Sequence, residues 1–225
     1  MNLRRSLLGV LPLIAISFAG SFAGSAYAAN LTESFDAKHK ECLERIAIDS
    51  ELAFEEAMIW QDDGGGRRAK HCVAMALFAR GHEDEAANRL DTLAKASDGG
   101  TPGMRADFYS EAANFWLIAK KPDKAYQSAT DGLALKTDHL DLRISRARAY
   151  AMSGFYEYAE IDLTSVLSYD PKHAGALRYR ADTRLQQGRL SEAKVDIENS
   201  LAYDPTVVET ALLRGQINEA IREAK

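Results

Sequence analysis

Proline is scarce in this chain, with five residues among 225. Those five fall near the N-terminus or between segments with helical periodicity. Because proline kinks or ends a helix, a chain with so few prolines leaves long stretches free to form helices. The scarcity therefore favours an all-helical protein.

An excess of positive charge is also missing. Acidic residues outnumber basic ones by 33 to 28, and the formal net charge is −5. Proteins that bind nucleic acids neutralise phosphates with dense lysine and arginine. We therefore expect no nucleic-acid partner.

No apolar run reaches the length of about 20 residues that a membrane-spanning helix needs. The most apolar stretch, Leu7 to Ala19, follows Arg4-Arg5 and precedes the small residues Ala26-Tyr27-Ala28. A positive start, a short apolar core and an A-x-A site are typical of a secretory signal peptide. We expect residues 1–28 to be removed, leaving a periplasmic or secreted protein of bacterial type without stable membrane insertion. An uncleaved anchor is the less favoured alternative.

Signatures of catalysis are absent from the sequence as well. It contains no glycine-rich phosphate loop, no serine elbow and no paired histidines at metal spacing. His39 and Cys42 are spaced like ligands on a helix, but the other pair, His71 and Cys72, is adjacent. Adjacent helical residues point about 100° apart, which disfavours a shared ion. We expect no enzymatic activity, no metal and no cofactor.

A repeat with an offset of 34 residues is the strongest pattern that is present. Eight residues recur: Ala147, Gly154, Ala159, Leu163, Leu167, Tyr169, Asp170 and Pro171 return as Ala181, Gly188, Ala193, Ile197, Leu201, Tyr203, Asp204 and Pro205. Two small residues flank a turn glycine, and a bulky aliphatic residue and Asp-Pro follow. This order is typical of two antiparallel helices that pack closely and lead into the next pair.

The repeat resembles that of the tetratricopeptide repeat (TPR) family. Tyr150 occupies a position where the family often has an aromatic residue, whereas the second copy has Arg184 there. The resemblance implies an all-α, right-handed superhelical solenoid of antiparallel helix pairs. It also implies a scaffold that binds a protein or peptide.

The same spacing, followed along the chain, predicts five repeats and a cap. We expect a degenerate first repeat at 29–66, repeats at 67–100, 106–139, 140–173 and 174–207, and a capping helix at 208–225. A segment rich in glycine, Ser97–Gly103, interrupts the period by about five residues, which a solenoid tolerates because a longer loop costs little. In the third repeat, Lys120-Lys121-Pro122 replaces the usual glycine turn.

The two cysteines, Cys42 and Cys72, fall near the same point of consecutive first helices. In an oxidising compartment a lone pair of cysteines tends to be joined, and neighbouring first helices lie side by side. We therefore expect a Cys42–Cys72 disulfide. Two buried thiols remain the alternative.

A concave groove lined by the first helices is the partner site that the resemblance implies. Carrying over the family's inward positions gives these candidate partner-binding residues: Asp107, Ser110, Asn114, Arg148, Arg178 and Asp182. Arginine suits a peptide carboxylate through paired hydrogen bonds. A solvated groove of mixed charge is the alternative. Four tyrosines are further interface candidates, since tyrosine is favoured at interfaces: Tyr126, Tyr156, Tyr158 and Tyr179.

The expected function is that of an exported adaptor or scaffold that binds a peptide or protein through this groove. Two other roles stay open. One is an accessory subunit of a cell-envelope machine for division, outer-membrane assembly or cytochrome maturation, docked by another face. The other is a self-associating structural protein.

Overall fold

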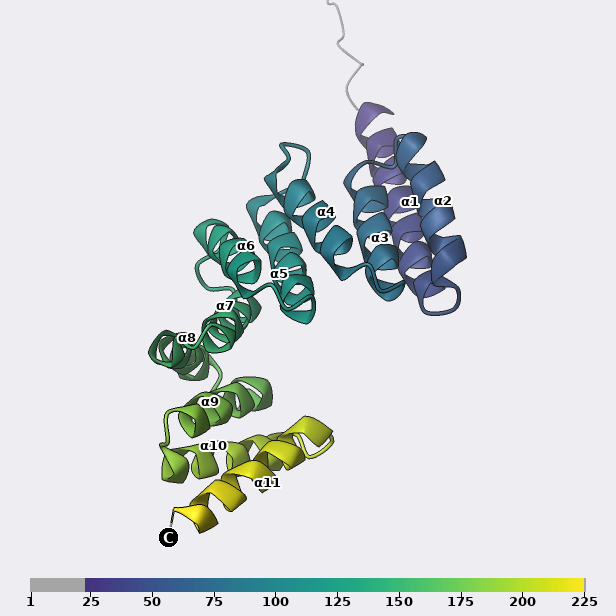
Figure 1. Cartoon of the computed structure of the whole chain (residues 1–225). Coiled ribbons are helices and arrows are strands. Elements are labelled where there is room, and N and C mark those ends of the chain that lie inside the picture. Colours follow the sequence, from purple (N-terminus) through teal and green to yellow (C-terminus); the bar gives the residue numbers. More distant parts are fainter. Residues whose placement is uncertain (1–22, 225) are drawn as a thin grey trace, which may run out of the picture.

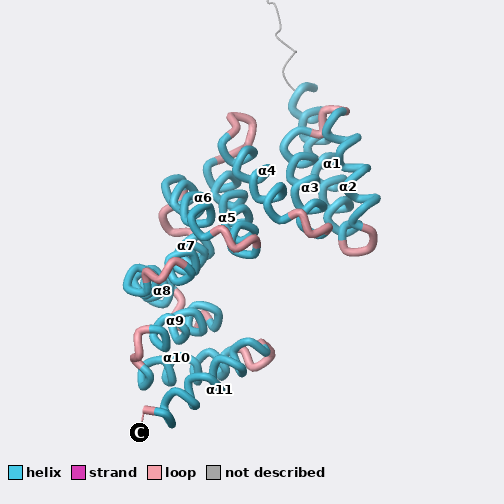
Figure 2. The backbone as a smooth tube through the Cα atoms, in the orientation of Figure 1, coloured by secondary structure: helices cyan, strands magenta, loops and turns pink. Residues whose placement is uncertain are grey.

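The computed structural model describes residues 23–224, and the side chains from residue 33 onward. Within this range the chain forms eleven helices and no strand (Figures 1 and 2). The helices are α1 (Ala23–Ile46), α2 (Ser50–Asp62), α3 (Gly66–Ala79), α4 (Glu83–Lys95), α5 (Pro102–Ile118), α6 (Pro122–Leu135), α7 (Leu140–Met152), α8 (Tyr156–Tyr169), α9 (Ala174–Gln186), α10 (Leu190–Tyr203) and α11 (Val208–Glu223). The predicted all-α fold is confirmed.

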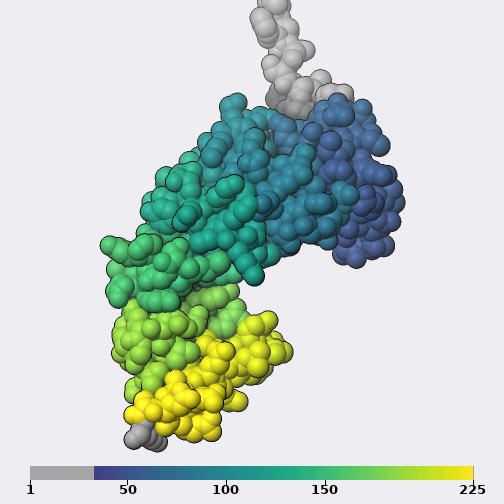
Figure 3. Space-filling view, in the orientation of Figure 1, coloured from purple at the N-terminus to yellow at the C-terminus, as the bar shows by residue number. Residues whose placement is uncertain are grey.

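The helices form a solenoid that bends into an arc (Figures 1 and 3). Helices α2 to α11 pack mainly on their neighbours in the chain, whereas α1 packs about equally on α2 and α3; α5 and α7 also touch, as do α7 and α9, and α9 and α11. In Figure 1, α5 and α7 lie on the inner side of the arc, and α6 and α8 on the outer side. In these two pairs the first helix therefore faces the inside of the curve.

Alanines allow the paired helices to approach closely. Ala113, Ala147 and Ala181 on first helices are fully buried, as are Ala125 and Ala159 on the helices that follow. The bulky residues of the repeat fill the remaining space, with Leu163 1% and Ile197 0% exposed. The apolar core therefore follows the whole arc.

The turns within the four pairs from α3 to α10 each contain a left-handed residue. Gly81, Gly154 and Gly188 have φ values of 79°, 81° and 73°. Glycine adopts this conformation without a steric penalty. In the turn between α5 and α6 the same place is taken by Lys120, with φ of 57°, so this turn keeps its shape without glycine.

Two buried ion pairs recur at the repeat distance. Arg146 on α7 donates to both carboxylate oxygens of Asp162 on α8, at 2.7 and 2.8 Å. Arg180 on α9 does the same to Asp196 on α10, at 2.8 and 2.9 Å. Asp162 is 4% and Asp196 2% exposed. These pairs orient the helices because a buried carboxylate without its partner is costly.

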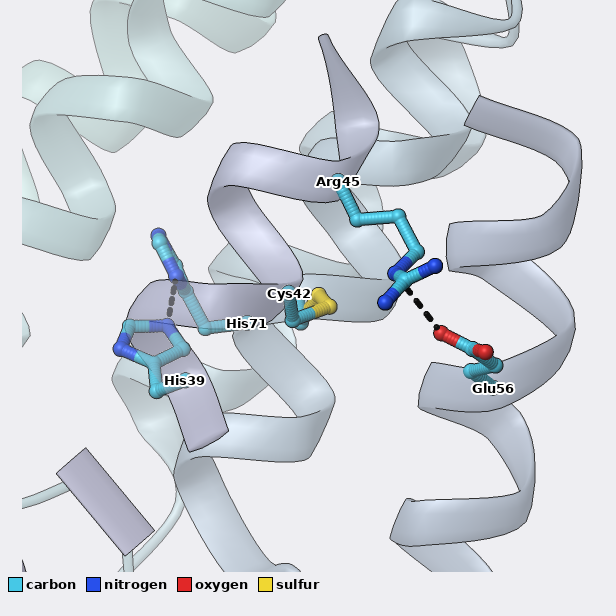
Figure 4. Close-up of a disulfide and its surroundings, with 6 residues drawn as sticks. His39, Cys42, Arg45, Glu56 and His71 are labelled. Carbon is cyan, nitrogen blue, oxygen red and sulfur yellow. Dashed lines mark hydrogen bonds and ion pairs between the residues drawn. A yellow bond between two sulfur atoms is a disulfide. The ribbon is translucent and has the colours of Figure 1, made fainter. Parts of the chain in front are cut away.

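A disulfide joins Cys42 on α1 to Cys72 on α3 (Figure 4). The predicted signal peptide, residues 1–28, lies outside the described residues except for Ala23–Ala28, which form the start of α1. Among the helices that the structure describes, none combines the length and the apolar character needed to cross a membrane.

Candidate partner-binding site

Arg148, on α7, is held in place by residues from both neighbouring first helices. Its Nη1 donates a hydrogen bond of 2.6 Å to Oδ1 of Asn114 on α5. Its guanidinium lies 5.0 Å from the centre of the Tyr179 ring on α9. A cation over an aromatic face is attracted by the ring quadrupole. The arginine side chain is therefore held by contacts within the chain.

Tyr179 is contacted by a second arginine. The guanidinium of Arg178 lies 4.8 Å from the same ring centre, and its Nη2 donates to the tyrosine hydroxyl at 3.1 Å. Arg178 also approaches Glu209 on α11, at 4.0 Å. Tyr179 thus contacts both Arg148 and Arg178, the two arginines that were predicted to line the groove.

A cleft of about 390 Å³ opens beside Arg148, between α7, α8 and α9. We call it the α7–α9 cleft; its lining consists of Ala147, Arg148, Ala151, Met152, Tyr156, Leu163, Tyr179, Asp182, Thr183 and Gln186. Ala147 and Leu163 are almost completely buried and form an apolar floor. Arg148, Asp182 and Gln186 are more exposed and form a polar rim.

Local sequence explains the cleft. Ala147 and Ala151 lie one helical turn apart on α7, so this face of the helix has no bulky side chain to fill the space toward α9. Tyr156 begins α8 directly after the turn at Gly154 and closes one end. At the rim, Gln186 donates to Oδ1 of Asp182 at 3.3 Å, one turn apart on α9.

The six predicted groove residues do not all meet. Arg148 and Asp182 line the cleft, and Asn114 and Arg178 contact its edge through Arg148 and Tyr179. Asp107 lies nearly two turns before Asn114 and accepts a hydrogen bond of 3.1 Å from His139. Ser110 is 8% exposed and offers little surface to a partner.

The central role of Tyr179 was not predicted from the sequence, although this tyrosine was an interface candidate. A signal was available, because Tyr179 precedes Asp182 by three residues and such pairs share a helix face. Met152, Thr183 and Gln186 also line the cleft. Nothing in the repeat pattern distinguishes these three from other groove positions.

A second polar cluster crosses the first three inner helices. Nε2 of His39 on α1 lies 2.8 Å from Nδ1 of His71 on α3 (Figure 4), and Nε2 of His71 lies 2.7 Å from a carboxylate oxygen of Glu111 on α5. Burial, with the neighbouring His71 ring and the Arg68 guanidinium, lowers the pKa of His39 to about 4. The His39 ring is therefore neutral at pH 7.

The part of the chain that the structure describes contains no cluster of three or more histidine, cysteine, aspartate or glutamate residues arranged to hold a metal ion. The sulfur atoms of Cys42 and Cys72 are bonded to each other. His39, His71 and Glu111 instead link α1, α3 and α5 by hydrogen bonds.

Aromatic residues gather at the edge formed by α6 and the turn between α7 and α8. The ring of Tyr150 lies 5.2 Å from that of Tyr126, 5.3 Å from Tyr158 and 6.5 Å from Phe155. Tyr126, Phe155 and Tyr158 are 38%, 54% and 57% exposed. We call these four residues the aromatic edge.

Comparison with known proteins finds similarity at the level of structure. No protein-family model matches the chain, and no curated protein matches it. A thermophilic TPR protein of Thermus thermophilus, TTC0263, superposes with a TM-score of 0.59 and 17% identity, over 81% of this chain and 98% of that one.

Two TPR domains superpose on about half of this chain. The first TPR domain of human RPAP3 gives a TM-score of 0.51 and 26% identity over 54% of this chain and 95% of that one. The first TPR of Spaghetti (RPAP3), solved bound to the HSP90 peptide SRMEEVD, gives 0.50 and 24% over 54% and 97%. The chain thus has the fold of TPR proteins, an all-α solenoid of TPR-like helical repeats.

Proposed function

We propose that this protein is a non-enzymatic interaction scaffold that binds a peptide segment of a partner in the α7–α9 cleft. The observation that carries the proposal is the fixed position of Arg148, between the Asn114 amide and the Tyr179 ring and beside an apolar cleft. A side chain already ordered loses little entropy on binding. Arginine and tyrosine are also the residues that contribute most at interfaces.

The composition of the cleft sets the kind of peptide that fits. Its floor, at Ala147 and Leu163, suits an apolar side chain, and Arg148 suits a carboxylate or carbonyl acceptor. Asp182 on the opposite rim suits a donor and repels a second acidic group. We therefore propose that the ligand is a short peptide segment. It carries one apolar side chain between a hydrogen-bond acceptor, which faces Arg148, and a hydrogen-bond donor, which faces Asp182. A solved structure with this fold, the first TPR of Spaghetti, holds a peptide, which is the same class of ligand.

We propose further that the protein acts outside the bacterial cytoplasm, in the periplasm or beyond. The leader pattern of residues 1–28 supports export, and a disulfide is compatible with an oxidising compartment. N-terminal sequencing of the protein recovered from a periplasmic extract tests this directly. A mature chain beginning at Ala29 supports export, whereas an intact N-terminus recovered with the cytoplasmic fraction contradicts it.

The binding experiment selects peptides from a random displayed library on the oxidised protein and measures their affinity by fluorescence polarisation. Arg148→Met keeps the aliphatic stem and removes the guanidinium. We expect the selected peptides to bind this variant at least about tenfold more weakly, as for the loss of a central interface residue. Arg222→Met is the matched control, since Arg222 lies on α11, away from the cleft, and its loss changes the net charge equally. Equal affinity for both variants would contradict the proposal.

Docking by another face is the second candidate, and the aromatic edge is the observation that favours it. Exposed tyrosines and phenylalanines are enriched where proteins meet. Such a role corresponds to an accessory subunit whose partner lies along α6 and α8. If binding of the selected peptides survives Arg148→Met but is lost in Phe155→Ala/Tyr158→Ala, the aromatic edge replaces the cleft as the site.

A further inference from the structure

Helix α1 differs from every other helix in how it is buried. None of the side chains that the structure describes on α1 is fully buried, whereas each of the other ten helices has at least three buried residues. Ile46 and Cys42 pack against the core, but each remains partly exposed. Most of the stability of a helix in a protein comes from a packed apolar face. The described part of α1, residues 33–46, therefore has no fully buried apolar side chain to anchor it.

The other contacts of α1 are polar or lie near the surface. Arg45 pairs with Glu56 on α2 at 3.2 Å, Asp36 pairs with Arg68 on α3, and Phe35 stacks on Trp60 at 6.2 Å. Surface ion pairs contribute about 0–1 kcal/mol each. The Cys42–Cys72 disulfide is the one covalent bond between α1 and α3, so it is the strongest constraint on the position of α1.

The two cysteines of this disulfide differ in their exposure to solvent. Cys72 is fully buried. Cys42 is partly exposed and forms part of the wall of an open pocket of about 330 Å³ between α1 and α2. The pocket is lined by Lys38, Glu41, Cys42, Arg45, Glu56, Ala57, Ile59 and Trp60. Figure 4 shows Arg45 and Glu56 on one side of the disulfide and the two histidines on the other.

We propose that this pocket admits a thiol to the Cys42 sulfur, and that thiol exchange at the disulfide releases and recaptures α1. A thiolate RS⁻ attacks Cys42, forming an R–S–S–Cys42 mixed disulfide and breaking the bond to Cys72, which leaves as a thiolate and takes up a proton. A second RS⁻ then attacks the outer sulfur, giving RSSR and the Cys42 thiolate. Two thiols are oxidised and one disulfide is reduced.

The charges around the pocket are consistent with an approaching thiolate. Lys38 lies about one helical turn before Cys42, and a positive group attracts and stabilises a thiolate. Both acidic residues of the pocket pair with Arg45, Glu41 at 3.4 Å and Glu56 at 3.2 Å. Lys38 lies over the Trp60 ring, 5.1 Å from its centre, and both residues line the pocket.

Release of α1 changes the surface at one end of the solenoid. Trp60 and His71 are 4% and 6% exposed and contact α1 through Phe35 and His39. Without α1 both side chains reach solvent, and α2 and α3 offer a new apolar face. This switch acts on the N-terminal end and does not depend on peptide binding at the α7–α9 cleft.

The first test asks which sulfur is attacked. The oxidised full-length protein is treated with 2-mercaptoethanol without denaturant, quenched with acid, alkylated with N-ethylmaleimide and mapped by mass spectrometry. We expect the mercaptoethanol adduct on Cys42 and the maleimide on Cys72, favoured over the reverse by about tenfold or more because exchange depends on access. Equal labelling, an adduct mainly on Cys72, or no reaction before denaturation would overturn the proposal.

A pair of substitutions tests whether the pocket is the route. Ile59 lines the pocket and is 63% exposed, so Ile59→Trp places a larger side chain across its mouth. We expect reduction by 2-mercaptoethanol to slow several-fold in this variant, since access controls the rate. Ile118→Trp is the matched control, because Ile118 is 50% exposed on α5. If both variants are reduced at the rate of the unchanged protein, the pocket is not the route.

Hydrogen exchange tests the release itself. Peptides that cover residues 33–46 should exchange faster after reduction, while peptides from α7 to α10 should keep their rates and serve as an internal reference. The variant Cys42→Ser/Cys72→Ser, which never forms the bond, should behave like the reduced protein. Unchanged exchange in α1 would show that the disulfide does not hold the helix. Faster exchange along the whole chain would mean global unfolding and would equally contradict the release of α1 alone.

Discussion

Gly132 on α6 is packed so closely that the fold leaves no space for a methyl group. An ideal Cβ added to it would lie 2.7 Å from Cδ1 of Leu142 and 2.9 Å from Cβ of Tyr109. We expect Gly132→Ala to lower the free energy of unfolding by about 1–3 kcal/mol, the usual cost of overpacking a core. Urea unfolding followed by circular dichroism measures it.

Gly215 on α11 provides the control for this change. A Cβ added there meets no described atom within 4 Å. Alanine is favoured over glycine inside a helix by about 0.5–1 kcal/mol, so Gly215→Ala should stabilise the protein by that amount. A loss of stability in Gly215→Ala as well would contradict the assignment of the Gly132→Ala effect to overpacking.

Single residues mark both the success and the limit of the sequence-based prediction. The offset of 34 residues identified the fully buried alanines Ala147 and Ala181. It did not identify Gly132, because the residues at the same offset are Val166 and Ser200 and share no chemistry with glycine. The need for a small residue there depends on how Leu142 and Tyr109 are oriented. These orientations cannot be predicted from the residues around Gly132.

The buried ion pairs were missed for another reason. Arg146 and Arg180 recur at the same offset as the alanines, and so do Asp162 and Asp196. The signal was therefore present, but charged residues at helical spacing usually lie on a solvated face. Their burial becomes evident only when the helix pairs are packed together.

Among the elements, α11 covers the last apolar surface of the solenoid. Leu213 and Ile217 are 9% and 0% exposed and pack with Ile197 of α10. Truncation after Tyr203 removes both residues, and burial of each such side chain is worth about 1.5–3 kcal/mol. We expect limited proteolysis to cut first in α9 and α10, with α5 and α6 protected for longer, since repeats depend on their neighbours. Unchanged protease resistance of the truncated protein would contradict this.

The existence of the helices was easier to predict than their contacts with one another. Turn residues and apolar spacing indicate where helices lie, and the all-α solenoid is confirmed by the structure. How neighbouring first helices meet depends on long side chains such as Arg148, which reaches both Asn114 on one helix and Tyr179 on another. Rotamers of this kind follow from packing and are not determined by the spacing of the sequence.

For the whole molecule, stability should depend on pH through His39. Its folded-state pKa is lowered to about 4 by burial and by the neighbouring His71 and Arg68, whereas an unfolded histidine titrates near 6.5. Between about pH 6.5 and pH 4 the unfolded chain binds more protons, so the free energy of unfolding should fall as pH falls. Because His39 is partly exposed, solvent screening should hold the loss to about 1–2 kcal/mol.

Comparison of the unchanged protein with His39→Gln isolates this effect. Urea unfolding at pH 7 and pH 4.5 should show a smaller drop in stability for the variant. The comparison is needed because burial raises the pKa of the Asp91 carboxyl, which acts in the opposite direction. An identical drop in both proteins would assign the pH dependence to other groups.

The position of the disulfide also determines how the molecule responds to mechanical force. Each helix depends on its neighbours, so a force applied to the two ends should unfold the solenoid one helix pair after another. Cys42 and Cys72 are 30 residues apart, and the bond keeps the chain between them out of the load. At about 3.3–3.6 Å per extended residue, this segment stores roughly 100 Å of contour length. That reserve becomes available under tension only when the bond is reduced.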